Sequence, residues 1–265
     1  MKKVLVLAAV LLPFIAMAQD SNLKTVKKTI SQNLTEKYTI SKDTKNKEGL
    51  YLVLDLDGKP LARGIYKNNQ REGIWSFFDQ STNVVQRYDY NNSKLVYVSS
   101  EDNGFVKSDY DVDAPADAKV NPPIKIGGET LGVLAFFKTS DIPNNIEKTK
   151  EGVYITYNLE VSETGKIGDV YVQYKTGDGV VTKKKVYYNE NFSLLDCIPA
   201  TVNGKPVKSN LMLTALINSS NTTFRKGSFV TSNQVPGGLP IPSSVGYSAP
   251  AYAPAAVSHS GGGVK

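Results

Sequence analysis

The stretch that decides the predicted fold reads Gly152-Val153-Tyr154-Ile155-Thr156-Tyr157-Asn158-Leu159-Glu160-Val161. Its apolar and polar residues alternate, which is typical of a β-strand with one buried face. A turn follows at Thr164-Gly165-Lys166, and a second alternating segment runs from Ile167 to Val172. Because two alternating segments flank a short glycine-containing turn, the sequence predicts an antiparallel β-hairpin.

A second distinctive stretch follows this hairpin. It reads Ile198-Pro199-Ala200-Thr201-Val202-Asn203-Gly204-Lys205-Pro206-Val207 and leads into an apolar segment. Upstream of the hairpin, Pro122-Pro123 and Gly127-Gly128 precede an apolar run that ends at Phe137. The order of these motifs from Pro122 to Asn218 resembles the C-terminal domain of TonB, the periplasmic energy transducer of Gram-negative bacteria.

The resemblance implies a small α+β domain at residues 122–218, with a helix covering the sheet and a second helix near residues 189–197. It also implies β-augmentation, in which an extended peptide from a membrane receptor pairs with an exposed strand. The implied peptide-pairing strand consists of Leu211, Met212, Leu213, Thr214, Ala215, Leu216 and Ile217. A buried core strand is the alternative, because this run is apolar.

Residues 49–100 predict an antiparallel meander, because β-type runs alternate with turns such as Asp57-Gly58. One unit reads Gly64-Ile65-Tyr66-Lys67-Asn68-Asn69-Gln70-Arg71-Glu72-Gly73-Ile74-Trp75-Ser76-Phe77-Phe78-Asp79. It resembles the MORN-like repeats of bacterial antitoxin-annotated proteins, which implies an interaction scaffold. Tyr66, Trp75 and Phe77 are candidate binding residues of that scaffold, and a place in the repeat core is the alternative.

The N-terminus has the pattern of a secretory signal peptide. Lys2-Lys3 precede an apolar run from Val4, which ends in the cleavage motif Ala16-Met17-Ala18. We therefore expect residues 1–18 to be removed after Ala18. The mature protein is expected to be periplasmic or secreted in a Gram-negative bacterium, without a stable membrane span, since the apolar run is too short to cross a bilayer.

The remaining segments connect or flank these units. Residues 19–48 are predicted as an N-terminal helix and a connection, because four apolar residues are spaced near the helical period: Leu23, Val26, Ile30 and Leu34. Residues 101–121 are acidic and predict a solvated linker, in which the run from Asp109 to Asp113 lacks the later glycine and glutamate of a calcium loop. Residues 219–265 are rich in Pro, Gly, Ser and Ala, and predict a disordered tail.

The counts of cysteine and histidine restrict the available chemistry. Cys197 and His259 are the only residues of their types, and His259 lies in the predicted tail. We therefore expect no enzyme activity, no cofactor and no metal site. Loss of Lys2 and Lys3 with the signal peptide would lower the formal net charge from +6 to +4, which is too small to indicate nucleic acid as a partner.

Together, these patterns predict an α+β chain that acts as a non-catalytic, exported adaptor or scaffold of the cell envelope. The expected partner is a protein, with a TonB-dependent receptor or another envelope protein as candidates. An energy transducer of the TonB type is one alternative function. A structural surface scaffold that uses the repeat sheet is another.

The predicted cleavage site can be checked directly. The exported protein should begin at Gln19, because the small side chains of Ala16 and Ala18 are those that signal cleavage requires. Mass spectrometry of the intact exported protein measures this. Ala18→Tyr should leave the uncleaved precursor, and an exported wild-type protein that retained residues 1–18 would contradict the prediction.

Overall fold

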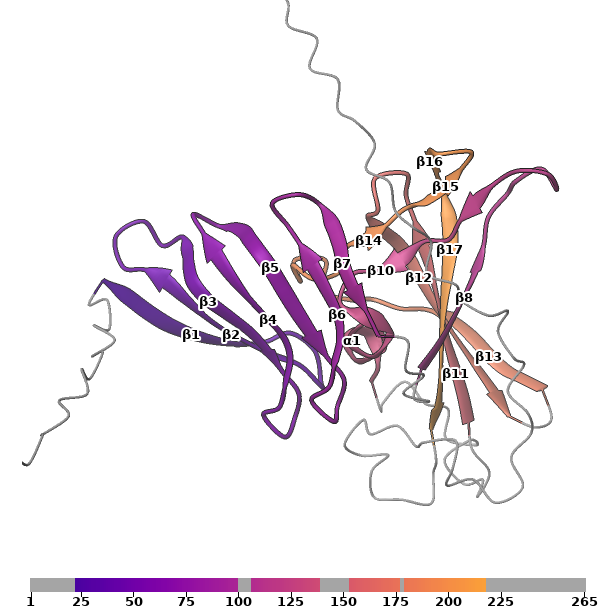
Figure 1. Cartoon of the computed structure of the whole chain (residues 1–265). Coiled ribbons are helices and arrows are strands. Elements are labelled where there is room, and N and C mark those ends of the chain that lie inside the picture. The colour runs from indigo at the N-terminus through magenta and orange to yellow at the C-terminus, as the bar shows by residue number, and fades with distance from the viewer. Residues whose placement is uncertain (1–21, 100–105, 139–152, 177–178, 218–265) are drawn as a thin grey trace, which may run out of the picture.

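The computed structural model describes residues 22–99, 106–138, 153–176 and 179–217. Within these ranges, two large antiparallel β-sheets lie on either side of one short helix (Figure 1). The predicted signal peptide (residues 1–18) and the predicted C-terminal tail (219–265) lie outside the described residues.

The first sheet has seven strands in sequence order, each paired with the next. They are β1 (Leu23–Thr29), β2 (Thr35–Ser41), β3 (Lys47–Leu54), β4 (Pro60–Lys67), β5 (Gln70–Phe78), β6 (Val84–Asp89) and β7 (Lys94–Val98). The turn between β4 and β5 places Asn68 and Asn69 at φ of 48° and 67°. Asparagine tolerates this left-handed region, so the turn can be tight. The predicted meander at residues 49–100 therefore forms β3 to β7, and two strands precede it.

The second sheet has the strand order β13-β12-β11-β17-β8. These strands are β8 (Val106–Asp111), β11 (Val153–Val161), β12 (Ile167–Thr176), β13 (Gly179–Lys185) and β17 (Ser209–Ile217). Two small ladders add β9 (Val120–Asn121), β10 (Ile124–Lys125), β14 (Cys197–Ile198), β15 (Ala200–Val202) and β16 (Lys205–Val207). The helix α1 (Gly128–Phe136) packs between the two large sheets (Figure 1).

The predicted α+β class is wrong, because the described residues are mostly β and contain a single helix of nine residues. The helix predicted within residues 19–48 is strand β1 instead. Thr25, Val26 and Thr29 are β-branched, which favours a strand, and β1 pairs with β2 along its whole length. The apolar spacing that suggested a helix runs through the turn after β1, where the Ile30 amide donates to the Leu34 carbonyl at 2.9 Å.

The second helix, predicted near residues 189–197, is also absent from the structure, which has turns and strand β14 there. The side-chain oxygen of Asn189 accepts a hydrogen bond from the Asn191 amide at 3.1 Å, and its carbonyl accepts one from the Phe192 amide at 3.0 Å. Asparagine side chains compete in this way with the helical backbone. The segment from Asn189 therefore begins as a turn.

The acidic segment predicted as a linker, residues 101–121, is partly strand. Its described part forms β8, which pairs with β17 from Val106 to Asp111, and β9, which pairs with β15. Backbone pairing with an apolar strand holds β8 in the sheet even though its outer residues are charged. The predicted boundary at residue 122 therefore cuts through the second sheet.

The two sheets share one hydrophobic core. Buried polar side chains also connect them. The amide nitrogen of Asn33 donates to the carbonyls of Leu134 (3.2 Å) and Phe137 (2.6 Å) at the end of α1. Gln86 on β6 donates to the Lys125 carbonyl at 3.2 Å and accepts from the Gly127 amide at 2.6 Å. Because these contacts satisfy buried backbone groups, they fix the position of α1 against the first sheet.

An aromatic row fills the inner face of the first sheet, the face toward α1. Successive rings in this row are 4.8–6.0 Å apart between centroids, and they belong to Tyr38, Tyr51, Tyr66, Trp75, Tyr90 and Tyr88. Such distances are typical of favourable aromatic pairs. Trp75 has room because Gly64 lies beside it: a Cβ added at Gly64 would come within 2.0 Å of the indole.

Gly64→Ala tests this packing. The added methyl group overlaps Trp75, so the row must shift, and we expect the free energy of unfolding to fall by about 1–3 kcal/mol. Chemical denaturation measures the change. Gly168→Ala is the matched control, because its added Cβ meets nothing closer than 3.8 Å. Equal stabilities for the two variants would show that Trp75 does not need the space at Gly64.

Candidate functional site

The structure places the predicted peptide-pairing strand inside the second sheet. β17 pairs with β11 on one side and with β8 on the other. Leu211, Leu213 and Ala215 are buried, and the hydroxyls of Thr214 and Thr156 lie 2.9 Å apart. Strand addition needs an open edge, and from Asn210 to Ala215 both edges of β17 are already paired. The structure therefore has the alternative arrangement, a core strand.

The three candidate residues of the repeat region lie in the core as well. Tyr66 is 4% exposed, and Trp75 and Phe77 are fully buried. Phe77 lies beside Gly127 at the start of α1, and Trp75 packs against the rings of its neighbours in the aromatic row. They stabilise the sheet and cannot contact a partner directly.

The ammonium of Lys47 lies among the first three rings of the aromatic row. The ammonium of Lys47 is 4.6 Å from the ring centre of Tyr38, 5.1 Å from that of Tyr51 and 4.9 Å from that of Tyr66. Burial lowers the pKa of Lys47 and raises that of Tyr51. Three aromatic rings around an ammonium form a cation–π site. Here the protein's own lysine fills that site.

Arg71 on β5 joins the first sheet to the 189–198 segment. Its guanidinium forms an ion pair with Asp196 and donates to the Ser193 carbonyl at 2.7 Å. It also lies 4.3 Å from the ring centre of Tyr90 and donates to its hydroxyl at 3.1 Å. The planar guanidinium can make these contacts at once, so Arg71 has a structural role at the junction.

Lys125 and Cys197 lie side by side on the β10–β14 ladder and are buried. The Lys125 ammonium donates to the carbonyls of Ile126 (2.6 Å) and Leu194 (2.7 Å). Burial lowers the pKa of Lys125 and raises that of the Cys197 thiol to about 11. A thiol that stays protonated at neutral pH is a poor nucleophile. This pair therefore supports the fold and offers no reactive group.

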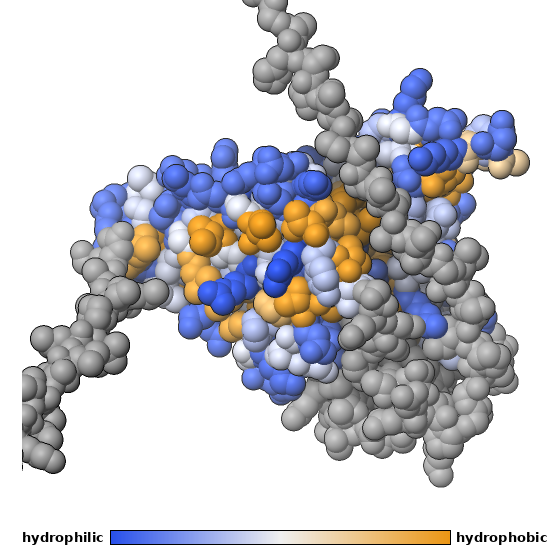
Figure 2. Space-filling model, viewed as in Figure 1, coloured by the Kyte–Doolittle hydropathy of each residue, from blue (hydrophilic) through white to orange (hydrophobic). Residues whose placement is uncertain are grey.

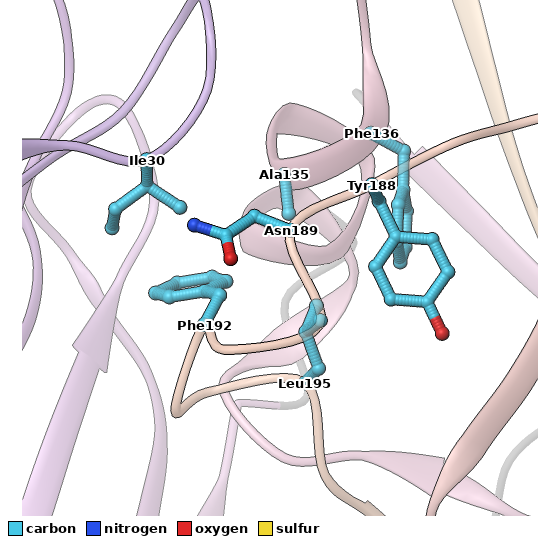
Figure 3. A pocket seen from close by; sticks show the side chains of 7 residues that line it. All are labelled: Ile30, Ala135, Phe136, Tyr188, Asn189, Phe192 and Leu195. Atoms are coloured by element: carbon cyan, nitrogen blue, oxygen red, sulfur yellow. The ribbon is translucent and has the colours of Figure 1, made fainter.

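A shallow hollow lies where α1 meets the 189–198 segment (Figure 3). It is lined by Ile30, Ala135, Phe136, Tyr188, Asn189, Phe192 and Leu195. Its empty volume is about 160 Å³ even when space open to solvent is included. Small-molecule sites usually measure 300–1,000 Å³. The hollow is too small to be a ligand site.

The described residues contain no cluster of His, Cys, Asp and Glu that could hold a metal ion. Among the same residues, no helix has the length and apolarity needed to cross a membrane.

The outer face of the first sheet, opposite the aromatic row, is the candidate functional surface. Leu50 on β3, Ile65 on β4 and Ile74 on β5 are 45%, 52% and 58% exposed. Leu50 and Ile65 are direct cross-strand partners, and Ile74 lies on the next strand. Figure 2 shows hydrophobic patches that follow one another across this sheet. We call these three residues the apolar row.

Sequence reasoning missed this surface, although a signal was present. Ile65 and Ile74 both lie in the MORN-like unit, next to Tyr66 and Trp75, for which a place in the repeat core was the alternative to a binding role. In a strand, neighbours of core residues point to the opposite face. An isoleucine beside a core aromatic residue therefore marks an exposed apolar position.

Comparison with known proteins gives no further guidance, because no family model, curated protein or solved structure matches this chain. The resemblances to the TonB domain and to MORN-like repeats therefore remain predictions from sequence.

The interior position of β17 makes a prediction about Thr214. Thr214→Pro removes a backbone donor from a strand paired on both sides, so we expect a loss of about 3 kcal/mol or more in the free energy of unfolding. Thr214→Val is the control, since it keeps the amide and the branched shape and loses only the hydroxyl contact with Thr156. Circular dichroism during denaturation measures both. A proline variant as stable as the valine variant would mean that β17 is not held between two strands.

Proposed function

We propose that this chain is a non-catalytic, exported scaffold of the cell envelope that binds a protein partner through the outer face of its first sheet. The observation that supports the proposal is the apolar row. Exposed apolar side chains are common singly, but adjacent ones on a flat surface mark interaction sites. Leu50, Ile65 and Ile74 occupy adjacent strands of one sheet face and are each about half exposed.

The fold also supports binding by holding this face rigid. The aromatic row and α1 fill the inner face of the sheet. The junction at Arg71 and Asn33 fixes the sheet to the rest of the chain. A surface that is ordered before binding loses little conformational entropy on association, which favours affinity.

Among the functions predicted from sequence, this proposal corresponds to the structural surface scaffold that uses the repeat sheet. A transducer or adaptor of the TonB type would bind a receptor peptide by strand addition. β17 lies between two other strands, so the strand implied by that resemblance is not accessible. The apolar row requires no displacement of a strand.

Photo-crosslinking in the exporting cells tests the proposal. A photoreactive amino acid at Ile65 or Ile74 should give a light-dependent adduct with one protein, because these side chains face the partner directly. The same amino acid at Tyr187, which is 78% exposed on the second half of the chain, is the control. Gel electrophoresis detects the adducts.

The variants Ile65→Thr and Ile74→Thr, combined with a photoreactive residue at Leu50, should lose the adduct. Threonine keeps the β-branched shape that the strand favours but removes apolar area from the contact. Adducts of equal yield at Ile65 and Tyr187, or none at any position of the apolar row, would refute a binding role for this face.

A further inference from the structure

A line of positive charge crosses the outer face of the first sheet. The strand registers align one residue from each of the seven strands: Lys27, Lys37, Leu52, Arg63, Ser76, Arg87 and Tyr97. Four of these residues are cations and none is an acid. All four cations are exposed, and none forms an ion pair with another described residue. We call this line the cationic row.

The cationic row is not visible in the sequence. Lys27, Lys37, Arg63 and Arg87 are scattered along the chain, and no two of them are neighbours. Lys27 and Lys37 lie directly opposite each other, which is unfavourable for two like charges. An acidic ligand would relieve this repulsion.

The apolar row runs beside the cationic row. On β3, Leu50 lies two residues from Leu52. On β4, Ile65 lies two residues from Arg63, and on β5, Ile74 lies two residues from Ser76. Residues two apart in a strand share a face and are separated by about 7 Å. The outer face therefore presents two parallel stripes, one cationic and one apolar.

From these two stripes we infer that the partner segment is an acidic amphipathic helix, laid across the strands. This inference rests on the proposed function and specifies the partner. A helix can present an acidic stripe and an apolar stripe side by side along its axis. Its width of about 10 Å covers both rows of the sheet.

The spacing of the charges agrees with a helix. Lys37, Arg63 and Arg87 lie on alternate strands, so they are about 9.6 Å apart. Two helical turns advance about 10.8 Å, so acids at every seventh position would meet successive cations. In an extended segment, residues on one face are about 6.8 Å apart, which does not match this spacing.

Other anionic surfaces fit the outer face less well. Glu72 is the cross-strand partner of Ile65, and Asp89 is that of Ile74, so a flat anionic bilayer would be pressed against two carboxylates. A sulfated polysaccharide or nucleic acid would satisfy the cationic row but would leave the apolar row without a contact. A helix that follows both rows contacts the cations and the apolar side chains together.

Titration calorimetry on the full-length protein tests the inference. The probe is a synthetic helix of about 19 residues, long enough for a row of about 29 Å, with a glutamate stripe beside a leucine stripe. A peptide of the same composition with scrambled order is the ligand control. The row variant combines Lys37→Gln, Arg63→Gln and Arg87→Gln, and so removes three of the four cations of the cationic row. Lys183→Gln, Lys184→Gln and Lys185→Gln remove the same charge from β13.

The probe should bind the wild type, and the row variant should weaken binding by about tenfold, since three exposed ion pairs contribute roughly 0.5 kcal/mol each. The β13 variant should bind like the wild type, and added salt should weaken wild-type binding more than that of the row variant. Ile65→Thr with Ile74→Thr should also weaken binding.

Each of the following outcomes would overturn the inference. Equal binding of the scrambled peptide, or tighter binding of a sulfated polysaccharide or of anionic vesicles, would show that the face recognises charge alone. Equal loss in the row and β13 variants would show attraction by net charge. If the probe does not bind but Ile65 still gives crosslinks, the helical partner is refuted and the proposed function stands. If the probe does not bind and no crosslinks form, the helical partner and the proposed function are both refuted.

Discussion

The fit of Trp75 against Gly64 is the contact on which the rest of the structure depends. It allows the aromatic row to continue from β3 to β6 without a gap. A closed aromatic row gives the first sheet an inner face that α1 and the 189–198 segment can cover. The hydrophobic stabilisation is roughly proportional to the apolar area removed from water. Covering this face therefore stabilises the contact between the two sheets and links them into one core.

The polar contacts at the junction follow from this burial. The side chains of Arg71 and Asn33 donate hydrogen bonds to backbone carbonyls of the second half of the chain. The Lys125 ammonium also donates to backbone carbonyls. Each of these side chains satisfies acceptors that would otherwise be buried without a partner, which costs about 1–3 kcal/mol per group. These side chains therefore determine how the halves fit together and are not available for chemistry at the surface.

With the inner face filled, the outer face is the face of the first sheet that remains exposed. Its cationic row follows from the strand registers, which bring residues far apart in the sequence onto one line. A shift of one residue in any register would turn the row residues of that strand inward. The aromatic core therefore determines the proposed binding surface indirectly, because it selects the register that exposes the cations and the isoleucines.

The sequence alone determined the local β-structure, since the period-two alternation of Gly152 to Val161 and the Asn-Asn turn at Asn68 depend on neighbouring residues. It misjudged β1, β8 and the segment after Asn189, where pairing with the next strand β2, pairing with the distant strand β17 and a local asparagine turn, respectively, outweigh spacing. Tertiary structure alone decided that β17 lies between β11 and β8, that Trp75 is core, and that four scattered cations share one line. Those outcomes depend on register and burial, which are set by contacts between residues far apart in the chain.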